Sequence, residues 1–467
     1  MALHPLQTML QRRAHGEKVG VTCACTAHPI AIEACIEVAR DTDTYALIEA
    51  TANQVDQYGG YTGLTPADFA QRVRDIAENA GLPAERLILG GDHLGPLVWS
   101  DLPETEAMAR AEELVRAYVQ AGFTKIHLDT SMRLADDDPD EPLTDETIAR
   151  RSARLALVAE ETFNADFDGD RMAQSTDDSN ADFDGERMAQ DGTSSNADFD
   201  GVRMAPVYVI GSEVPIPGGA HDNEETVSVT TPEHFAQTYE AFEKTFAERG
   251  LEDAFERIVA VVVQPGVEFS DATITDYNRD KASALCARLA PYPTIVFEGH
   301  STDYQMPGRL RQMVEDGIAI LKVGPALTFA LRQALFALSD IEDELLKDDT
   351  THTPSDFKNV LLDAMWADPK YWKDHYHNTD EVELNHQMLY SLSDRCRYYL
   401  SDENVRASLA RLIENIDSLD IPLDLLKQHL PQQYRNVKEG NVPLSASALV
   451  KDHIKERIAD YLFAIGS

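Results

Sequence analysis

The sequence predicts a closed (β/α)₈ barrel of the TIM type over residues 1–345, followed by a helical C-terminal region over residues 349–467. Short β-rich runs alternate with longer helical patterns up to about residue 345, and there are eight such pairs. The β-rich runs are nearly continuously apolar, as expected for strands of a parallel sheet that is buried on both faces. Eight strand–helix units in a chain of this length favour a closed barrel over an open doubly wound sheet.

The expected strands follow one another at the spacing that a barrel requires. They cover residues 19–28, 45–51, 87–93, 125–131, 207–213, 258–266, 294–301 and 319–324. The helical patterns between them, such as 65–81 and 104–122, carry apolar residues at three- and four-residue spacing and end on a Gly. The first strand leads into TCACTAHP, which lacks the Gly-rich turn of a dinucleotide-binding fold.

Two segments lie outside this pattern. The C-terminal region is expected to dock on the barrel or on a partner through aromatic side chains, which are Trp366, Tyr371, Trp372, Tyr398 and Tyr399. The other segment, residues 164–205, holds three copies of a unit that begins NADFDG and repeats every sixteen residues. We expect this insertion to be a disordered, solvated acidic loop between barrel elements, with a weak cation site as the alternative.

The composition indicates which partners are excluded and in which compartment the protein works. Its 81 acidic and 41 basic residues give a formal net charge of -40, which repels nucleic acids and anionic membranes. A charge of this size favours adaptation to a high-salt cytoplasm, where screening weakens self-repulsion. Five Cys without metal-finger spacing, no signal segment and no membrane-spanning apolar run predict a cytoplasmic protein.

Polar side chains stand at the end of nearly every expected strand. In TIM barrels these ends converge on one site, whereas residues in the middle of a strand pack. The polar residues are His28, Glu49, Asp92, His93, His127, Asp129, Glu213, Gln264, Glu298, His300 and Lys322. Their number predicts a single small-molecule site.

The neighbours Asp92 and His93 are the most informative pair. Neutral imidazole commonly binds a catalytic divalent ion, and an adjacent carboxylate can donate or accept a proton. Oxygen and imidazole ligands suit Zn²⁺, Mn²⁺ or Co²⁺. The expected metal ligands are His93, Glu213 and His300, and the expected catalytic residues are Asp92, Glu49 and Asp129. The alternative is that these residues only pair with one another.

The last two strand ends, GHSTDYQ (299–305) and KVGPALTFALR (322–332), lie where barrels often bind phosphate. Lys322 adds a positive charge there, although it could also neutralise Glu298 or form a Schiff base. The expected substrate- and phosphate-binding residues are Gln54, His127, Gln264, Ser301, Asp303, Lys322 and Gly324.

At these residues the chain resembles the GatZ/KbaZ family, and the resemblance covers nearly the whole sequence. The matching blocks include CTAHPIAIEA (25–34), GGDHLGP (90–96), VIGSEVPIPGG (209–219), GHSTDYQ and YSLSDRCRYY (390–399). The Asp-His pair at a strand end also resembles that of metal-dependent class II aldolases. The chain departs from the family at the acidic insertion and at Leu97, where related chains tend to have Asn.

The resemblance implies a TIM-barrel subunit of D-tagatose-1,6-bisphosphate aldolase in galactitol and galactosamine breakdown. In that role the chain stabilises a separate class II aldolase subunit that carries the zinc. Because some relatives are enzymes in their own right, the alternative that the resemblance implies is a stand-alone metal-dependent D-tagatose 6-phosphate 4-epimerase that works by retro-aldol cleavage and re-addition. A third hypothesis is a metal-independent sugar-phosphate binder. The expected partners are a catalytic aldolase chain and a sugar phosphate, and we expect an oligomer.

Overall fold

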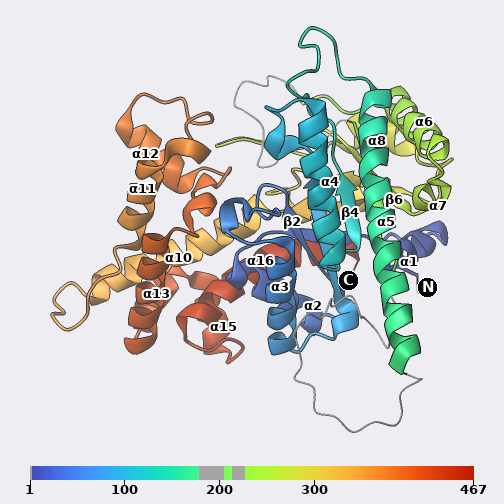
Figure 1. Cartoon of the computed structure of the whole chain (residues 1–467). Coiled ribbons are helices and arrows are strands. Elements are labelled where there is room, and N and C mark those ends of the chain that lie inside the picture. Colours follow the sequence, from blue (N-terminus) through green and yellow to red (C-terminus); the bar gives the residue numbers. More distant parts are fainter. Residues whose placement is uncertain (1–2, 178–203, 213–226, 467) are drawn as a thin grey trace.

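The computed structural model describes residues 3–177, 204–212 and 227–466 and confirms the predicted barrel (Figure 1). Eight parallel strands close in the order β1-β10-β9-β6-β5-β4-β3-β2. They are β1 Val21–Cys25, β2 Ala46–Thr51, β3 Leu87–Leu94, β4 Lys125–Leu128, β5 Val207–Ile210, β6 Ile258–Val263, β9 Val296–Gly299 and β10 Ile318–Val323. Each coincides with an expected strand to within a few residues.

The helices that follow the strands form the outer layer. They are α2 Pro29–Asp41, α3 Pro66–Ala80, α4 Glu104–Gln120, α5 Asp145–Asp177, α6 Pro232–Glu248, α7 Glu252–Phe255, α8 Arg279–Ala287, α9 Pro307–Asp316 and α10 Pro325–Leu345. The residues at the two ends of α3 show why the helix begins and ends where it does. Thr65 and Asp68 form a capping box at its start, and Gly81, with a φ of 74°, ends it.

A short helix closes the amino end of the barrel. Helix α1 (Pro5–Ala14) packs Leu6, Met9 and Leu10 onto the lower layer of inward-facing strand residues, which includes Val209 and Val262. Helices α11 (Phe357–Ala367), α12 (Glu381–Tyr390) and α13 (Glu403–Ser418) of the C-terminal region lie on the opposite side (Figure 1). The barrel is thus sealed at one end and open to a site at the other.

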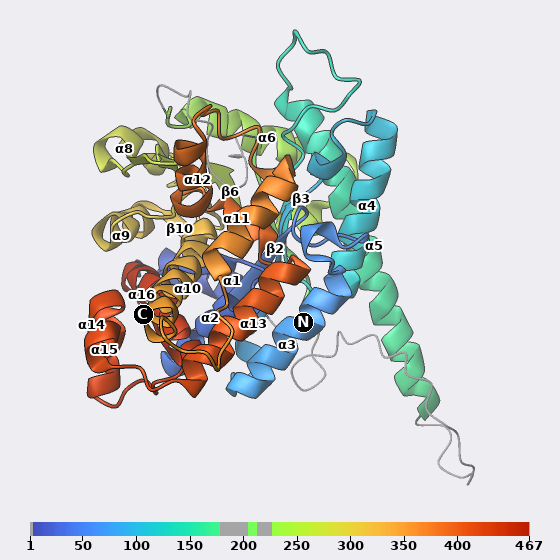
Figure 2. The same ribbon diagram turned by 90° about the vertical axis from the view of Figure 1, so that its left-hand side faces the viewer.

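The C-terminal region contains α11 Phe357–Ala367, α12 Glu381–Tyr390, α13 Glu403–Ser418, α14 Leu423–His429, α15 Pro431–Lys438 and α16 Ala446–Ile465. Helix α10 leads from the barrel to these helices, and α16 returns to pack against α2, α9 and α10 (Figures 1 and 2). The last helix of the region that was expected to dock on the barrel or on a partner therefore joins the outer ring of the barrel.

The segment that carries YSLSDRCRYY fixes the C-terminal region to the barrel. Arg332 of α10 forms an ion pair of 2.6 Å with the buried Asp394. Asp271, in the turn between β7 (Glu268–Phe269) and β8 (Ile274–Thr275), accepts hydrogen bonds from the hydroxyls of Ser391 and Ser393 at 2.8 and 2.6 Å. These contacts hold the following short helix η5 (Arg395–Tyr399) in one position beside the barrel mouth.

The acidic repeats fall largely outside the described residues. Helix α5 continues to Asp177 and so includes the first copy, which the sequence analysis had placed in a loop. The later copies cover 180–190 and 196–205, and of these only residues 204 and 205 are described. Within the described part of the chain, no helix combines the length and the apolarity needed to cross a membrane.

Candidate active site

A cavity of about 670 Å³ opens at the carboxyl ends of the strands. Barrel residues form its floor, and the C-terminal region forms part of its wall through Arg397, Tyr398 and Leu409. Eight of the expected site residues line the cavity, namely Gln54, Asp92, His93, His300, Ser301, Asp303, Lys322 and Gly324. The convergence of strand ends that the sequence predicted is therefore present.

The end of β3 is shaped so that two consecutive side chains face the cavity. Side chains of a regular strand alternate between its faces. Here the pairing of β3 with β4 shifts between Gly91 and Leu94, and His93 has a φ of 49°. This left-handed conformation is uncommon for a residue other than Gly, and such strain concentrates at functional sites. Because of the bulge, Asp92 and His93 both point into the site.

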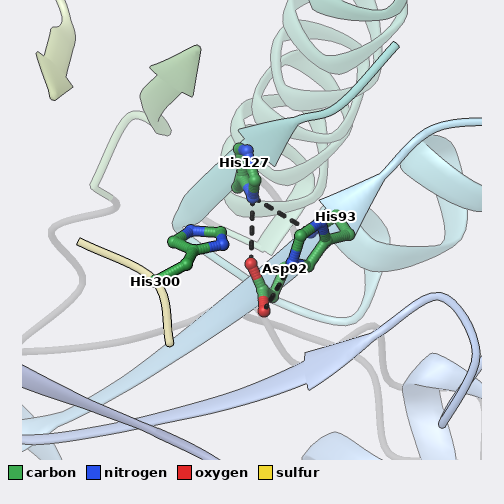
Figure 3. A group of neighbouring side chains, drawn as sticks. All are labelled: Asp92, His93, His127 and His300. Carbon is green, nitrogen blue, oxygen red and sulfur yellow. Dashed lines mark hydrogen bonds and ion pairs between the residues drawn. The ribbon is translucent and has the colours of Figure 1, made fainter. Parts of the chain in front are cut away.

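Four side chains form a buried cluster at this point (Figure 3). Asp92 and His93 come from β3, His127 from β4 and His300 from the end of β9, and each offers a ligand atom within 4.8 Å of the others. Asp92 Oδ1 lies 2.9 Å from His127 Nδ1. The structure brings His93 and His300 together as expected, and it places His127, which we had assigned to substrate binding, in the same cluster.

The hydrogen bonds of His127 leave a buried ring nitrogen that could bind a divalent metal. Its Nδ1 faces both the carboxylate of Asp92 and the backbone N–H of His93, which donates to it at 3.1 Å. One ring nitrogen cannot donate to the first and accept from the second in the same protonation state. Its Nε2 is buried with no hydrogen-bond partner among the described residues. Three imidazoles and a carboxylate are a donor set that suits Zn²⁺, Mn²⁺ or Co²⁺.

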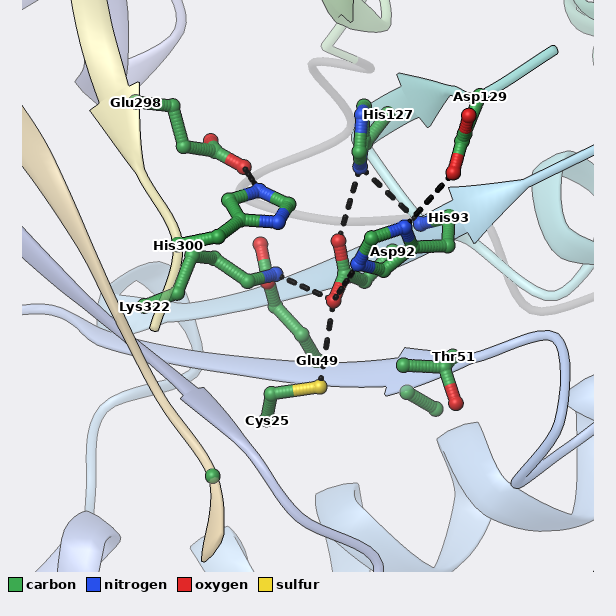
Figure 4. Close-up of polar contacts among 12 residues, drawn as sticks. Cys25, Glu49, Thr51, Asp92, His93, His127, Asp129, Glu298, His300 and Lys322 are labelled. Carbon is green, nitrogen blue, oxygen red and sulfur yellow. Dashed lines mark hydrogen bonds and ion pairs between the residues drawn. The ribbon is translucent and has the colours of Figure 1, made fainter. Parts of the chain in front are cut away.

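A layer of alternating buried charges lies next to the cluster, and Figure 4 shows three of its members, Glu49, Glu298 and Lys322. Lys125 is fully buried and lies 2.7 Å from both Glu49 and Glu298. Lys322 joins Glu49 to Asp92, with Nζ 2.7 Å from Asp92 Oδ2. Gly90 makes room for this layer, because a Cβ at that position would lie 2.7 Å from Glu49 Oε1.

These neighbours set the ionisation of the cluster. Burial raises the pKa of Asp92, but the facing charges of His93 and Lys322 outweigh it and hold that pKa well below its usual value. Burial disfavours a charged His93, yet Asp92 and Asp129 raise its pKa. For His300, burial dominates and lowers the pKa to about 4, so this imidazole is neutral at pH 7 and able to bind a metal.

Two carboxylates orient the imidazoles from outside the cluster. Asp129 Oδ2 lies 2.8 Å from His93 Nδ1, and Glu298 Oε1 lies 2.9 Å from His300 Nε2. Such carboxylate–histidine pairs fix the ring orientation of metal-binding histidines. Asp129 and Glu49, which the sequence analysis expected to be catalytic, lie behind the residues that line the cavity.

The expected phosphate position is partly filled by the protein itself. The backbone N–H groups of Gly324 and Ala326, at the start of α10, donate to Asp303 Oδ1 at 3.0 and 2.8 Å. Burial raises the pKa of this carboxyl group to about 6. The N–H groups that were expected to face a phosphate therefore already have an acceptor.

Gln264, which was expected to bind substrate, does not line the cavity. Gln264 Oε1 accepts from the N–H groups of Gly266 and Val267 at 2.8 and 3.0 Å, so its side chain stabilises the turn after β6. Glu213 lies outside the described residues, and its role as a metal ligand stays a prediction. Leu97, the departure from the family pattern, begins the short helix η3 (Leu97–Trp99) and is not among the residues lining the cavity.

The sequence reasoning missed two cations. Lys125 is the first residue of β4, at the strand end away from the cavity, but it shares the inward parity of His127 two residues later. Because Glu49 also points inward, this parity indicates that Lys125 can pair with it inside the barrel. Arg397 is far from the barrel in sequence, and its presence in YSLSDRCRYY did not indicate that it reaches the cavity.

The fold and the site define a TIM-barrel protein whose cavity at the strand ends is lined by histidines and carboxylates. Residues 6–466 match the family described as D-tagatose-1,6-bisphosphate aldolase subunit GatZ/KbaZ-like. The chain therefore belongs to the GatZ/KbaZ-like family, as its sequence blocks indicated.

The chain is also similar to solved structures. The crystal structure of a probable tagatose 6 phosphate kinase from Sinorhizobium meliloti 1021 is 39% identical, with a TM-score of 0.80 over 95% of this chain and 100% of that chain. The fructuronate-tagaturonate epimerase UxaE from Cohnella laeviribosi is 12% identical, with a TM-score of 0.44 over 96% of this chain and 82% of that chain. A likeness as distant as the second carries no argument about activity.

Proposed function

We propose that this chain is itself an enzyme, a metal-dependent epimerase that inverts C4 of D-tagatose 6-phosphate by retro-aldol cleavage and re-addition. The observation that supports it is the buried cluster of Asp92, His93, His127 and His300, which opens into a cavity of about 670 Å³. Buried ionic groups can often be replaced by apolar ones without loss of stability. A chain that only stabilised another subunit would therefore gain little from this cluster and its charge layer.

His93, His127 and His300 are the residues that would hold the metal, with Asp92 beside them. A divalent ion bound there supplies a Lewis acid for the oxygens of the ketose. Asp129 and Glu298 keep the rings of His93 and His300 in place. In this account Asp129 is a positioning residue.

We assign the proton transfer to Asp92. Its carboxylate lines the cavity, and the lowered pKa keeps it ionised at neutral pH. During cleavage it accepts the proton of the C4 hydroxyl while the C3–C4 bond breaks and its electron pair passes to the ketone side. After the aldehyde turns, the bond re-forms on the opposite face and Asp92 returns the proton.

Lys322 supports this carboxylate and does not act as a Schiff-base residue in this account. Burial lowers its pKa, but Asp92 and Glu49 outweigh burial and raise that pKa well above its ordinary value. A Schiff base requires a neutral amine. The ammonium group instead stabilises the negative charges of Glu49 and Asp92 on either side of it.

The second candidate is a stabilising subunit of a class II D-tagatose-1,6-bisphosphate aldolase, and the family description favours it. The two functions make opposite predictions for the purified chain. An epimerase converts tagatose 6-phosphate to fructose 6-phosphate alone and stops after chelation. A stabilising subunit is inert alone and raises the activity or lifetime of an added class II aldolase chain.

The test incubates the purified chain with tagatose 6-phosphate in high salt, with and without added Zn²⁺, Mn²⁺ or Co²⁺. We expect fructose 6-phosphate to form with metal and not after treatment with a strong chelator. Because one similar protein is described as a probable tagatose 6 phosphate kinase, ATP is added in a parallel sample. A product that forms only with ATP, or only with an aldolase chain, would contradict the epimerase.

A further inference from the structure

The cavity must bind a negatively charged substrate in a protein of net charge -40 if the proposed function is correct. Two of its lining residues, Asp92 and Asp303, are themselves acidic. A phosphate group therefore needs a cation that is not already neutralised. The cations that line the cavity are Arg72, Lys322, Arg397 and Arg406.

Three of these four cations are poor candidates for a phosphate anchor. Lys322 is committed to Glu49 and Asp92. Arg72 and Arg406 are exposed on the helices α3 and α13, where charges are strongly screened and hold anions weakly. Arg397 is partly buried, and no carboxylate oxygen of the described residues lies within ion-pair distance of it, although Asp394 and Asp303 are near enough to interact with its charge. A partly buried guanidinium without a directly paired carboxylate gains stability when a ligand supplies the negative charge.

The hydrogen bonds of Arg397 leave one edge of its guanidinium available. Nη1 donates to the carbonyl oxygens of Ser393 and Asp394, and Nη2 donates to the hydroxyl of Tyr398 at 2.9 Å. The Nε–H and the second Nη2–H find no acceptor among the described residues. Two such donors form a planar fork that matches two oxygens of a phosphate.

The position of Arg397 is fixed before any ligand binds. Its guanidinium lies 4.4 Å from the centre of the Tyr398 ring, and Tyr398 packs edge-on against Tyr61 of the barrel at 4.7 Å. The ion pair between Arg332 and Asp394 holds the preceding residues. A pre-organised donor loses little conformational entropy on binding, which favours affinity.

We propose that Arg397, supplied by the C-terminal region, is the phosphate-binding residue of this cavity. The inference rests on the proposed function for the identity of the sugar. It places the phosphate at the part of the cavity wall formed by η5 rather than at the start of α10. That assignment agrees with the use of the Gly324 and Ala326 N–H groups by Asp303. The C-terminal region is then part of the active site.

The test compares Arg397→Gln and Arg397→Lys with a control, Arg411→Gln. Arg411 is an exposed residue of α13 that does not line the cavity, so the control makes the same change in net charge. Calorimetric titration with tagatose 6-phosphate should show binding about 10- to 100-fold weaker for Arg397→Gln, as expected for one charge-assisted hydrogen-bonding group. Arg397→Lys, which keeps the charge and loses the fork, should fall between Arg397→Gln and wild type.

Two further measurements separate binding from folding. Inorganic phosphate should raise the melting temperature of wild type and of Arg411→Gln, and should leave Arg397→Gln unchanged. Unphosphorylated tagatose should bind wild type and Arg397→Gln equally, which also shows that the variant is folded. Equal weakening for both sugars, or an unchanged affinity for tagatose 6-phosphate, would overturn the proposal.

The outcomes also distinguish this inference from the proposed function. A wild-type chain that binds tagatose 6-phosphate through Arg397 but does not epimerise it supports the inference and contradicts the epimerase. An active epimerase whose Arg397→Gln variant keeps the wild-type KM supports the function and refutes the inference.

Discussion

Replacing Lys125 with Met removes the cation that joins two buried carboxylates beneath the active site. Lys125 and both of its partners, Glu49 and Glu298, are fully buried, and each N–O distance is 2.7 Å. Met has nearly the same length and no charge, so the change isolates the electrostatic contribution. Glu49 keeps Lys322 as a partner, whereas Glu298 is left with His300.

Removing one member of a buried ion pair costs about 3–5 kcal/mol, because it leaves a charge without compensation. We therefore expect Lys125→Met to lower the free energy of unfolding by this amount at pH 7. Urea denaturation followed by tryptophan fluorescence measures it. The control is Lys244→Met, since Lys244 pairs with Glu248 at 4.0 Å on the surface, with exposed fractions of 71% and 63%. Such a pair contributes at most about 1 kcal/mol.

The cost should also depend on pH. Burial raises the pKa of Glu298, but Lys125 is the largest of the influences that together hold it below the ordinary 4.5. A depressed carboxyl pKa contributes stability above about pH 4.5, and that contribution is lost as the pH falls through the folded-state pKa. The difference between wild type and Lys125→Met should therefore shrink on acidification.

A second substitution tests the reason for the loss. Changing Glu298 to Gln in the Lys125→Met background removes the unpaired charge and should recover much of the lost free energy. A Lys125→Met variant as stable as Lys244→Met would refute the reasoning. So would a double variant that recovers nothing, because the loss would then come from packing.

Three further predictions follow from single features. Burial raises the pKa of Asp303 from 3.8 to about 6, so the folded state of wild type loses stability as the pH rises through that window. In urea denaturation, the free energy of unfolding of Asp303→Asn should therefore gain roughly 3 kcal/mol relative to wild type between pH 4 and 7. Parallel pH profiles of the two proteins would contradict this. Gly90→Ala should lower the melting temperature, because its Cβ would meet Glu49 and reduce the stability by about 1–3 kcal/mol. The control Gly308→Ala in α9 has open space around it and should not lower the melting temperature. Equal melting temperatures of the two variants would count against the charge layer. Dialysis to low salt should unfold the chain, which has a net charge of -40. The Debye length grows from about 3 Å at 1 M to about 30 Å at 0.01 M, so repulsion between its acidic residues then acts over a longer range. A circular-dichroism melting curve that stays unchanged at low salt would exclude adaptation to high salt.

The barrel could be predicted because its strands carry a strong and local signal. A run such as IVAVVV in β6 is buried along its whole length, and only a sheet covered on both faces uses such a strand repeatedly. The return of α16 to the ring could not be predicted. Its apolar pattern indicates a buried face but does not say which surface covers it.

The site was predictable to the extent that strand ends converge. That rule brought together Asp92, His93, His300 and Lys322. It could not show that Asp303 caps α10, or that Gln264 folds back on its own turn, because both depend on local backbone geometry. Arg397 reaches the cavity only through the docking of a distant segment, which no spacing in the sequence encodes.

The most direct test of the account is the metal content of the purified chain, measured together with its turnover of tagatose 6-phosphate. Wild type should retain about one divalent ion per chain and form fructose 6-phosphate. His93→Ala should lose both metal and turnover, and Asp92→Asn should keep the metal and lose turnover, because only the proton acceptor is gone. A chain that remains active after strong chelation, or an Asp92→Asn variant with wild-type turnover, would contradict the assignment of this cluster as a catalytic metal site.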